Sequence, residues 1–296
     1  MSRRVRRAVR AIVLWPPLNR LLTAALAAAL PVRAKRHPAV ARYVPRVGVV
    51  QATLPDGRVL RMGSRGDDDI ASPLFWRGWD GHESETARVF YELAGTARVT
   101  LDIGAHVGYF ALLAAHANPT GRVYAFEPMP RVRERLERNV ALNGASNVTC
   151  VSCALGSPAG SAEFFHVRDG IPSSSSLSRG FMQSIVAREE LTSSTVEVVE
   201  GDDFVASHAL ERVDLIKLDT EATEPAVLGG LLATLRRDRP PIICEVLDAQ
   251  AGRELQDLLD PLGYEYFLLT ADGPLPRASI RPDALWHNFL FRASDG

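Results

Sequence analysis

The residues best placed to do chemistry lie in one short stretch near the middle of the chain. An apolar run from Val99 to Ile103 carries a single acid, Asp102, and leads into a turn that contains Gly104 and Gly108. A helix-like stretch follows, and a second apolar run ends on Glu127. A strand, a glycine turn, a helix, a second strand and an acid in this order are typical of a nucleotide-type cofactor site.

The residue two positions after Gly104 indicates which cofactor this site would take. A dinucleotide loop has the pattern G-x-G-x-x-G, whose middle glycine lets the backbone approach a pyrophosphate. Here His106 occupies the position of that middle glycine. S-adenosylmethionine has ribose and adenine but no phosphate, so its site can accommodate a side chain there. The two oxygens of Glu127 could accept hydrogen bonds from both ribose hydroxyls. The pattern therefore favours S-adenosylmethionine over NAD(P), and glycines that only permit tight turns are the third interpretation.

The composition limits the other possibilities. A chain of 296 residues can form one large α/β domain with an appendage, or two modest domains. With 46% hydrophobic and 23% charged residues it is typical of a soluble globular protein, and a net charge of −1 gives no signal for nucleic acid. Cys150 and Cys153 have redox or zinc spacing, but residues three apart in a strand point to opposite faces. We therefore expect free, buried thiols and, with an odd cysteine count, a reducing cytoplasmic location.

Residues 1–46 form a basic and partly apolar extension. They contain eleven Arg and Lys residues and no acid. The apolar parts, 11–15 and 21–30, are separated by Pro16, Pro17, Asn19 and Arg20, and both are shorter than the ~20 residues that a membrane span needs. We expect a helical or partly disordered extension that packs on its own domain, with a weak contact to a membrane surface as the alternative. The basic start also resembles a signal peptide, but chemistry with a cytosolic cofactor argues against export.

The remaining sequence predicts a hairpin and then a doubly wound domain. Residues 47–82 read as a hairpin with its turn at Pro55-Asp56-Gly57, followed by a loop with Trp76 and Trp79. Residues 83–296 alternate between strand and helix patterns, which predicts a mostly parallel sheet with helices on both faces. The expected strands are 99–103, 122–127, 147–154, 213–218, 241–247, 264–270 and 286–292. The expected helices are 83–94, a stretch ending near 117, 131–143, a short one from 202, 224–235 and 251–261. Two strand-like runs, 161–167 and 195–199, interrupt this rhythm around a serine-rich segment.

The loops after the first four strands should converge, because ligands bind beyond the carboxyl ends of parallel strands. Cys153 and Ala154, at the end of the third strand, are therefore expected near the adenine of the cofactor. Glu85, from the preceding helix, is a further candidate for cofactor contact, and a plain helix acid is its equal alternative.

The order of these signals resembles the FkbM-type methyltransferases, a class I S-adenosylmethionine-dependent family, over roughly residues 83–292. The residues from Asp102 to Tyr109 are similar to the family's motif Asp-x-Gly-Ala-Asn-x-Gly-Tyr, with His106 in place of the Asn. Residues 125–128, 154–156 and Gly160 resemble two further blocks. Residues 217–224 are similar to Lys-x-Asp-x-Glu-Gly-x-Glu, with Ala222 in place of the Gly, although Ala tolerates a positive φ poorly.

The resemblance implies a Rossmann-like fold with a doubly wound, seven-stranded, mostly parallel sheet whose last strand is antiparallel. It implies transfer of a methyl group, mostly to hydroxyl oxygens of sugars and secondary metabolites. The cofactor-binding residues it implies, together with those placed above, are Asp102, Gly104, Ala105, His106, Gly108, Glu127, Pro128, Cys153, Ala154 and Glu85. We expect His106 to be neutral and structural, because a protonated ring would repel the sulfonium of the cofactor, and a role as a base is the alternative.

The candidates for catalysis lie at the end of the fourth strand. Lys217 and Asp219 share one strand face, and Glu221 follows just beyond. Asp219 or Glu221 could orient or deprotonate the acceptor hydroxyl while Lys217 tunes it. A structural pair of Lys217 with Asp219 or Glu245 is the alternative, since buried charges need partners. The same three acids could hold a divalent ion, but no tight ligand loop is visible, so we expect no metal.

Two other functions remain open at this point. One is an NAD(P)-linked oxidoreductase, which the missing middle glycine disfavours. The other is a non-catalytic module that binds a membrane surface through residues 1–46.

Overall fold

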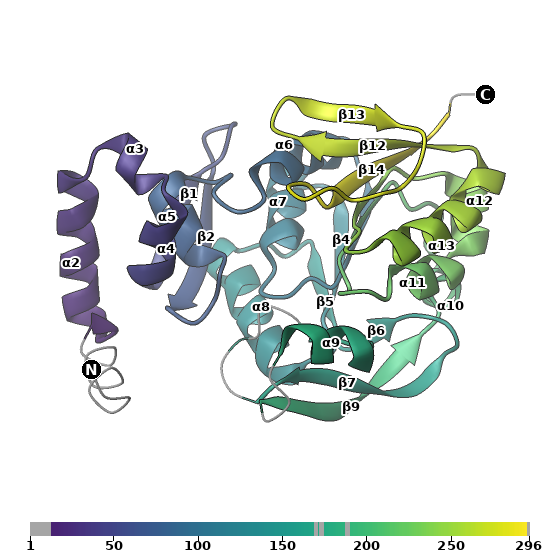
Figure 1. The fold of residues 1–296 in the computed structure, drawn as a ribbon, viewed down its shortest axis with the longest axis horizontal. Coiled ribbons are helices and arrows are strands. Elements are labelled where there is room, and N and C mark those ends of the chain that lie inside the picture. Colours follow the sequence, from purple (N-terminus) through teal and green to yellow (C-terminus); the bar gives the residue numbers. More distant parts are fainter. Residues whose placement is uncertain (1–12, 169–170, 172–174, 187–189, 295–296) are drawn as a thin grey trace. The chain divides into compact units, whose positions relative to one another are not determined.

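The computed structural model describes residues 13–168, 171, 175–186 and 190–294 (Figure 1). The chain divides into two compact units. The first, here called the N-terminal unit, comprises Met1–Ser84 with Ala141–Gly144, and the second, the sheet unit, comprises Glu85–Val140 with Ala145–Gly296.

The N-terminal unit contains the expected hairpin and one helix that the sequence did not indicate. Strands β1 (Val47–Thr53) and β2 (Val59–Arg65) pair antiparallel around the turn at residues 55–57, which confirms the hairpin. The expected loop with the two tryptophans is partly helical, because α5 (Ala71–Arg77) includes Trp76. The side chain of Asp68 accepts hydrogen bonds from the backbone N–H groups of Ile70 and Ala71 (3.2 and 2.7 Å), and so satisfies donors at the start of that helix.

The described part of the extension is helical and packs on the hairpin. It forms α2 (Pro16–Ala29), α3 (Val32–Lys35) and α4 (Pro38–Tyr43). Pro16 and Pro17 do not break a helix here but begin one, because the first turn needs no backbone donor. Asn19 fastens α2 to the chain before and within β1, since it donates to the carbonyl of Pro45 and accepts from the N–H of Val47, both at 2.8 Å. Residues 1–12, which belong to the same expectation, lie outside the described residues.

The sheet unit is built on the mixed sheet that the sequence predicts, with one additional strand. Its order is β13-β12-β14-β11-β10-β3-β4-β5. The strands are β13 (Gly273–Arg277), β12 (Tyr264–Thr270), β14 (Asn288–Ala293), β11 (Ile242–Glu245), β10 (Leu215–Leu218), β3 (Val99–Ile103), β4 (Arg122–Phe126) and β5 (Val148–Val151). The run from β11 to β5 is parallel, and β14 lies antiparallel between β11 and β12. The eighth strand, β13, was not expected, and it forms an edge hairpin with β12 after the turn at 271–272.

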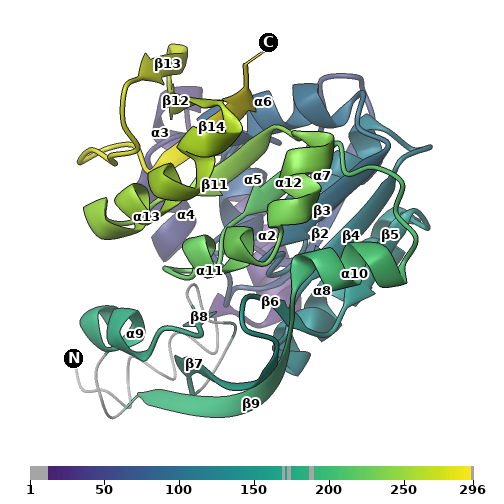
Figure 2. The ribbon, with the colours of Figure 1, turned by 90° about the vertical axis from the view of Figure 1, so that its right-hand side faces the viewer.

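Helices cover both faces of this sheet (Figures 1 and 2). They are α6 (Ser84–Ala94), α7 (Tyr109–Ala117), α8 (Pro130–Asn143), α10 (Gly201–Ser207), α11 (Glu224–Gly229), α12 (Leu232–Asp238), α13 (Ala249–Leu259) and a 3-10 turn at Asp260–Leu262. Phe204 of α10 and Leu255 of α13 belong to the apolar cluster on one face. The single helix expected at 224–235 is two, because the side chain of Asp202 accepts from the N–H groups of Ala233 and Thr234 (both 2.8 Å) and so starts α12 anew.

The described residues between 154 and 199 form a separate small sheet of the order β6-β9-β7-β8. Its strands are β6 (Ala154–Leu155), β9 (Leu191–Val199), β7 (Gly160–Val167) and β8 (Ser175–Ser176), and α9 (Arg179–Ile185) follows β8. The strand expected over 147–154 is therefore divided, since β5 ends at Val151 and β6 pairs with β9 instead. Of the serine-rich segment, residues 169, 170 and 172–174 lie outside the described residues.

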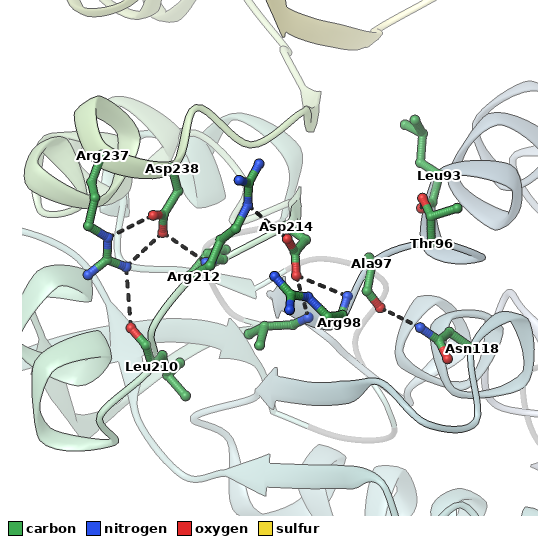
Figure 3. A network of polar contacts seen from close by, with 12 residues as sticks. Leu93, Thr96, Ala97, Arg98, Asn118, Leu210, Arg212, Asp214, Arg237 and Asp238 are labelled. Atoms are coloured by element: carbon green, nitrogen blue, oxygen red, sulfur yellow. Dashed lines mark hydrogen bonds and ion pairs between the residues drawn. The ribbon is translucent and has the colours of Figure 1, made fainter.

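Two carboxylates fix the amino ends of the parallel strands, at the edge of the sheet opposite to the loops that follow β3 and β10 (Figure 3). Asp214 accepts from the N–H groups of Arg98 and Val99, both at 3.0 Å. Asp238 accepts from the N–H of Val213 (2.8 Å) and from the guanidinium of Arg237 (2.7 Å). Burial raises the pKa of Asp238, but these hydrogen bonds and the nearby positive charges outweigh it, so the net pKa lies below its usual value.

We expect Asp238→Ala to lower the free energy of unfolding by about 1–3 kcal/mol at pH 7, because it leaves the N–H of Val213 without its acceptor. The depressed pKa of Asp238 means that the ionised form is favoured in the folded state. Its contribution is therefore complete above the ordinary pKa of 3.8 and is lost as the pH falls below that value. Urea unfolding of both proteins between pH 7 and pH 3 measures the difference.

The exposed Asp257 of α13 provides the control. Asp257→Ala should change the stability by less than about 0.5 kcal/mol. Equal stability losses for the two variants, or a loss for Asp238→Ala that does not shrink in acid, would contradict the role given to Asp238.

Candidate functional site

The loop after β3, residues 104–108, is held in place by hydrogen bonds from its own backbone. The N–H groups of Gly104 and Ala105 donate to the carbonyl of Phe126 at the end of β4 (3.2 and 2.9 Å), and the N–H of Gly108 donates to Ala105 (2.8 Å). A dinucleotide loop instead turns such N–H groups toward a pyrophosphate. The geometry therefore favours a cofactor that does not require a phosphate cradle.

Each glycine of this loop is required by a close neighbour. A Cβ on Gly104 would lie 1.8 Å from the carbonyl oxygen of Asp219, and one on Gly108 would lie 2.4 Å from a methyl carbon of Leu136. Both residues also have a positive φ, +83° and +91°. Gly104 thus brings the loop after β3 into direct contact with the end of β10, whose residues were predicted to be catalytic.

His106 has a backbone conformation that explains why a polar residue occupies its position. Its φ is +51°, in the left-handed region, which Asn, Asp and His adopt more readily than other side chains. The Asn of the family motif and the His of this chain therefore meet the same backbone requirement.

Glu127 lies directly after β4 with only 4% of its surface exposed. One carboxyl oxygen accepts from the N–H of Met129 at 2.8 Å. Burial raises the pKa of Glu127 to about 8, although the N–H groups of Met129 and His106 and the charge of Arg133 act in the opposite direction. The carboxyl group thus touches the backbone of the loop that contains His106, and its burial favours the protonated form.

The other residues predicted to bind the cofactor stay predictions, and the structure places them as follows. Asp102 is buried within β3, and Pro128 follows Glu127. Cys153 is buried between β5 and β6, and Ala154 is the buried first residue of β6. The N–H of Glu127 donates to the carbonyl of Val151 (3.0 Å), so β4 and β5 end at the same edge as the loop. Glu85 lies half-buried in the first turn of α6.

The thiols of Cys150, Cys153 and Cys244 are all free, as expected. Burial raises the pKa of both Cys150 and Cys153 to about 11, so these groups are neutral thiols and poor nucleophiles.

Lys217 and Asp219 form the buried ion pair that the strand periodicity predicts. Their Nζ and carboxylate oxygen are 3.1 Å apart, and Lys217 has no exposed surface while Asp219 is partly exposed. The ammonium also lies 4.8 Å from the ring centroid of Phe110 on α7. The ion pair holds the Asp219 carboxylate just beyond the carboxyl end of β10. The carboxylate remains partly exposed there.

Glu221 and Glu245 join Asp219 in one acidic cluster. One carboxylate oxygen from each of the three residues lies within 4.8 Å of the others, and all three side chains are half-buried. Oxygen donors of this kind suit Mg²⁺ or Ca²⁺. The three carboxylates come from the ends of two adjacent strands, β10 and β11, so they meet without the contiguous ligand loop on whose absence we based the expectation of no metal. Lys217 already supplies one positive charge to the cluster.

Three residues that the sequence did not single out hold these loops in position. Glu224, which is almost fully buried, accepts from the N–H and the hydroxyl of Thr220 (2.9 and 3.0 Å). Ser176 of β8 donates to the carbonyl of Glu221 (2.5 Å), so the small sheet is tied to the acidic cluster. Asn139 of α8 donates to the carbonyl of Val107 (2.8 Å). Only Glu224 had a signal in the sequence, as the last acid of the motif at 217–224.

The loop after β10 takes left-handed backbone conformations at two consecutive residues that are not glycine. The φ of Glu221 is +58° and that of Ala222 is +75°. Residue 222 is the position at which the family motif has Gly. The loop thus retains a glycine-like shape in spite of the substitution, and the Cβ of Ala222 strains it.

We expect Ala222→Gly to raise the free energy of unfolding by about 0.5–1 kcal/mol. The left-handed conformation costs a non-glycine residue about 1–2 kcal/mol, and the greater chain entropy of Gly offsets part of the gain. Thermal unfolding measured by circular dichroism should show a midpoint about 1–3 °C higher.

The matched control is Ala226→Gly in α11, an exposed helical position. Glycine there should lower the stability by about 1 kcal/mol. A loss of similar size for Ala222→Gly would mean that residue 222 does not have the left-handed conformation.

Comparisons with known proteins place this site within one family. The profile of the methyltransferase FkbM domain matches residues 102–266, more than half of the chain, and includes the loop after β3, Glu127 and the acidic cluster. Methyltransferase sdnD of Sordaria araneosa is 30% identical over 154 residues, which are 44% of this chain and 59% of that protein. The 31-O-demethyl-FK506 methyltransferase FkbM of Streptomyces tacrolimicus is 27% identical over 159 residues, 45% of this chain and 59% of that protein.

The chain thus spans less than two thirds of the length of these relatives. Among solved structures, the methyltransferase FkbM from Methylobacillus flagellatus KT is similar with a TM-score of 0.41 and 15% identity. The match covers 76% of this chain and 54% of that one.

Proposed function

Because this chain belongs to the FkbM methyltransferase family, whose cofactor is S-adenosylmethionine, we propose that it transfers a methyl group to a hydroxyl oxygen of a small molecule. The acceptor that we propose is a sugar, a glycoside or another secondary metabolite. The observation that carries the proposal is the contact of Gly104 with the carbonyl of Asp219, which joins the cofactor loop to the acidic cluster. A cofactor bound at the loop after β3 would therefore lie next to the carboxylates of the acidic cluster.

The residues at the ends of β3 and β4 fit the cofactor by their chemistry. Glu127 is a buried carboxyl group next to the loop, suited to accept hydrogen bonds from a ribose diol. Asp102 is a buried acid near Glu127, which suits a cofactor that carries a positive sulfonium. Loop N–H groups that are already bonded to Phe126 disfavour the NAD(P) alternative. When bound, S-adenosylmethionine supplies a methyl group that is already activated for transfer.

The remaining work for the protein is to align the acceptor and to take up one proton. The carboxylates of Asp219 and Glu221 can accept a hydrogen bond from an acceptor hydroxyl and then its proton. Lys217 keeps Asp219 fixed at 3.1 Å, so the acceptor would meet a base whose position is set in advance. We propose that these carboxylates act directly, without a metal ion, because Lys217 already compensates part of their charge.

The small sheet supports a role in binding the acceptor. Ser176 attaches β8 to the carbonyl of Glu221, so the segment that interrupts the strand–helix rhythm borders the acidic cluster. Arg131 of α8 donates to the carbonyl of Arg168 (2.6 Å) and thereby anchors the carboxyl end of β7, where that strand pairs with β8. We propose that this sheet provides a wall of the acceptor site. The free thiols support a reducing, cytoplasmic location for the reaction.

We expect Glu127→Gln to weaken the binding of S-adenosylmethionine by about 1.5–3 kcal/mol, roughly tenfold to a hundredfold or more, because it replaces a carboxylate acceptor with an amide. The raised pKa of Glu127 adds a pH dependence. Ribose hydroxyls bond best to the ionised group, so the affinity of the wild type should rise as the pH increases through about 8. Calorimetric titration at pH 6.5, 8 and 9.5, roughly one and a half pH units on either side of that pKa, measures this dependence.

The control for this substitution is Glu134→Gln on α8, whose side chain is 62% exposed. Its affinity and pH dependence should match the wild type. Glu127→Gln with wild-type affinity, or with the wild-type pH dependence, would remove Glu127 from the cofactor site.

We expect Asp219→Asn to leave cofactor affinity within about twofold and to slow turnover by about 10²–10⁴-fold, the usual contribution of a general base. Product formation is followed by mass spectrometry with labelled cofactor and extracts of the native cell as the source of acceptor. Asp257→Asn, at an exposed position, is the control and should retain full turnover.

Treatment with EDTA tests the proposed absence of a metal in the same assay. Turnover should survive it, and a loss that Mg²⁺ restores would show that the three carboxylates hold an ion instead. Wild-type turnover of Asp219→Asn would make Asp219 purely structural.

A further inference from the structure

The outer surface of α2 is apolar although it faces solvent. Leu21 and Leu22 are 72% and 41% exposed, and Trp15, just before the helix, is 60% exposed. Of the fourteen residues of α2 only Asn19, Arg20 and Thr23 are polar. Asn19 and Thr23 are buried, at 1% and 0% exposure. The helix therefore presents Asn19 and Thr23 to its own unit and Leu21, Leu22 and Leu26 outward, the reverse of an ordinary surface helix.

Hydrogen bonds on the inner side fix this orientation. Asn19 bonds to the backbone of Pro45 and Val47, both at 2.8 Å. The hydroxyl of Thr23 donates to the carbonyl of Asn19 (2.7 Å) and accepts from the guanidinium of Arg46. Rotation of α2 to bury its leucines would break these hydrogen bonds. Each polar group left buried without a partner would then lower the free energy of unfolding. The exposed apolar surface is thus a fixed feature of the N-terminal unit.

The charges around α2 indicate what could cover this surface. The first 46 residues contain eleven basic residues, and the first acid of the chain is Asp56. In the described part of this segment, Arg20, Arg33, Arg36 and Arg42 are exposed. The described part of this segment therefore contributes an apolar face and positive charges to the surface, and no acid. A second copy of the same surface would bring like charges together, which disfavours self-association through it.

We propose that the N-terminal unit binds the surface of an anionic phospholipid membrane through α2 and the arginines around it. An interfacial helix inserts its apolar side chains among the upper acyl chains, while basic side chains contact anionic headgroups. The fourteen residues of α2 extend about 21 Å, less than the ~30 Å of a bilayer core, so the helix would lie along the surface. Among the described residues, none of the helices has the length and apolar character needed to cross a membrane.

Cosedimentation of the full chain with vesicles tests this proposal. One set contains phosphatidylcholine alone, and the other about one third phosphatidylglycerol. Wild-type protein should bind the anionic vesicles at least about tenfold more tightly than the neutral ones, and the binding should weaken as salt is raised. Leu21→Glu with Leu22→Glu should reduce binding to anionic vesicles by about tenfold or more, because both leucines would lose their contact with acyl chains.

The matched control is Leu275→Glu with Leu285→Glu, two leucines of the sheet unit that are 44% and 77% exposed. This variant should bind as the wild type does, and circular dichroism verifies that both variants are folded. Three outcomes would overturn the proposal. The first is a wild type that binds neither set of vesicles, and the second is equal binding by the two variants. The third is a wild type that does not bind vesicles but forms a concentration-dependent dimer, which Leu21→Glu with Leu22→Glu abolishes.

Discussion

The site depends on the approach of two backbone segments, the loop after β3 and the end of β10. Gly104 and the carbonyl of Asp219 are so close that even a Cβ would not fit between them. The N–H of Asp219 in turn donates to the carbonyl of Ile103 at 3.0 Å, which continues the pairing of the two parallel strands to their ends. This contact sets the separation between the residues proposed for the cofactor and those proposed for the acceptor.

Burial of charge is the second constraint on the site. The sheet encloses Glu127, Glu224 and Lys217 almost completely. Each is compensated differently: burial raises the pKa of Glu127 and so favours its neutral form, Glu224 accepts two hydrogen bonds from Thr220, and Lys217 pairs with Asp219. The compensation leaves Asp219, Glu221 and Glu245 as the partly exposed acids at the carboxyl edge. Those are the groups that can meet a substrate.

Much of this arrangement could be predicted from the sequence, because it follows from local patterns. Three features depend only on the chemistry of residues that are neighbours in the sequence. They are the strand Val99–Ile103, the turn with Gly104 and Gly108, and the alternation of Lys217 and Asp219. What could not be predicted depends on partners far apart in the chain. Ser176 meets Glu221 across 45 positions, and Asn139 meets Val107 across 32. The capping of α12 by Asp202, and the acidic cluster formed by two adjacent strands, likewise arise only in the folded chain.

A crystal structure of the chain with S-adenosylhomocysteine, the product form of the cofactor, tests the central claim most directly. The account expects the ribose hydroxyls within hydrogen-bond distance of the Glu127 carboxylate, and the sulfur on the side of Gly104 that faces Asp219. Adenosine density elsewhere on the molecule, or a sulfur turned away from the acidic cluster, would contradict it.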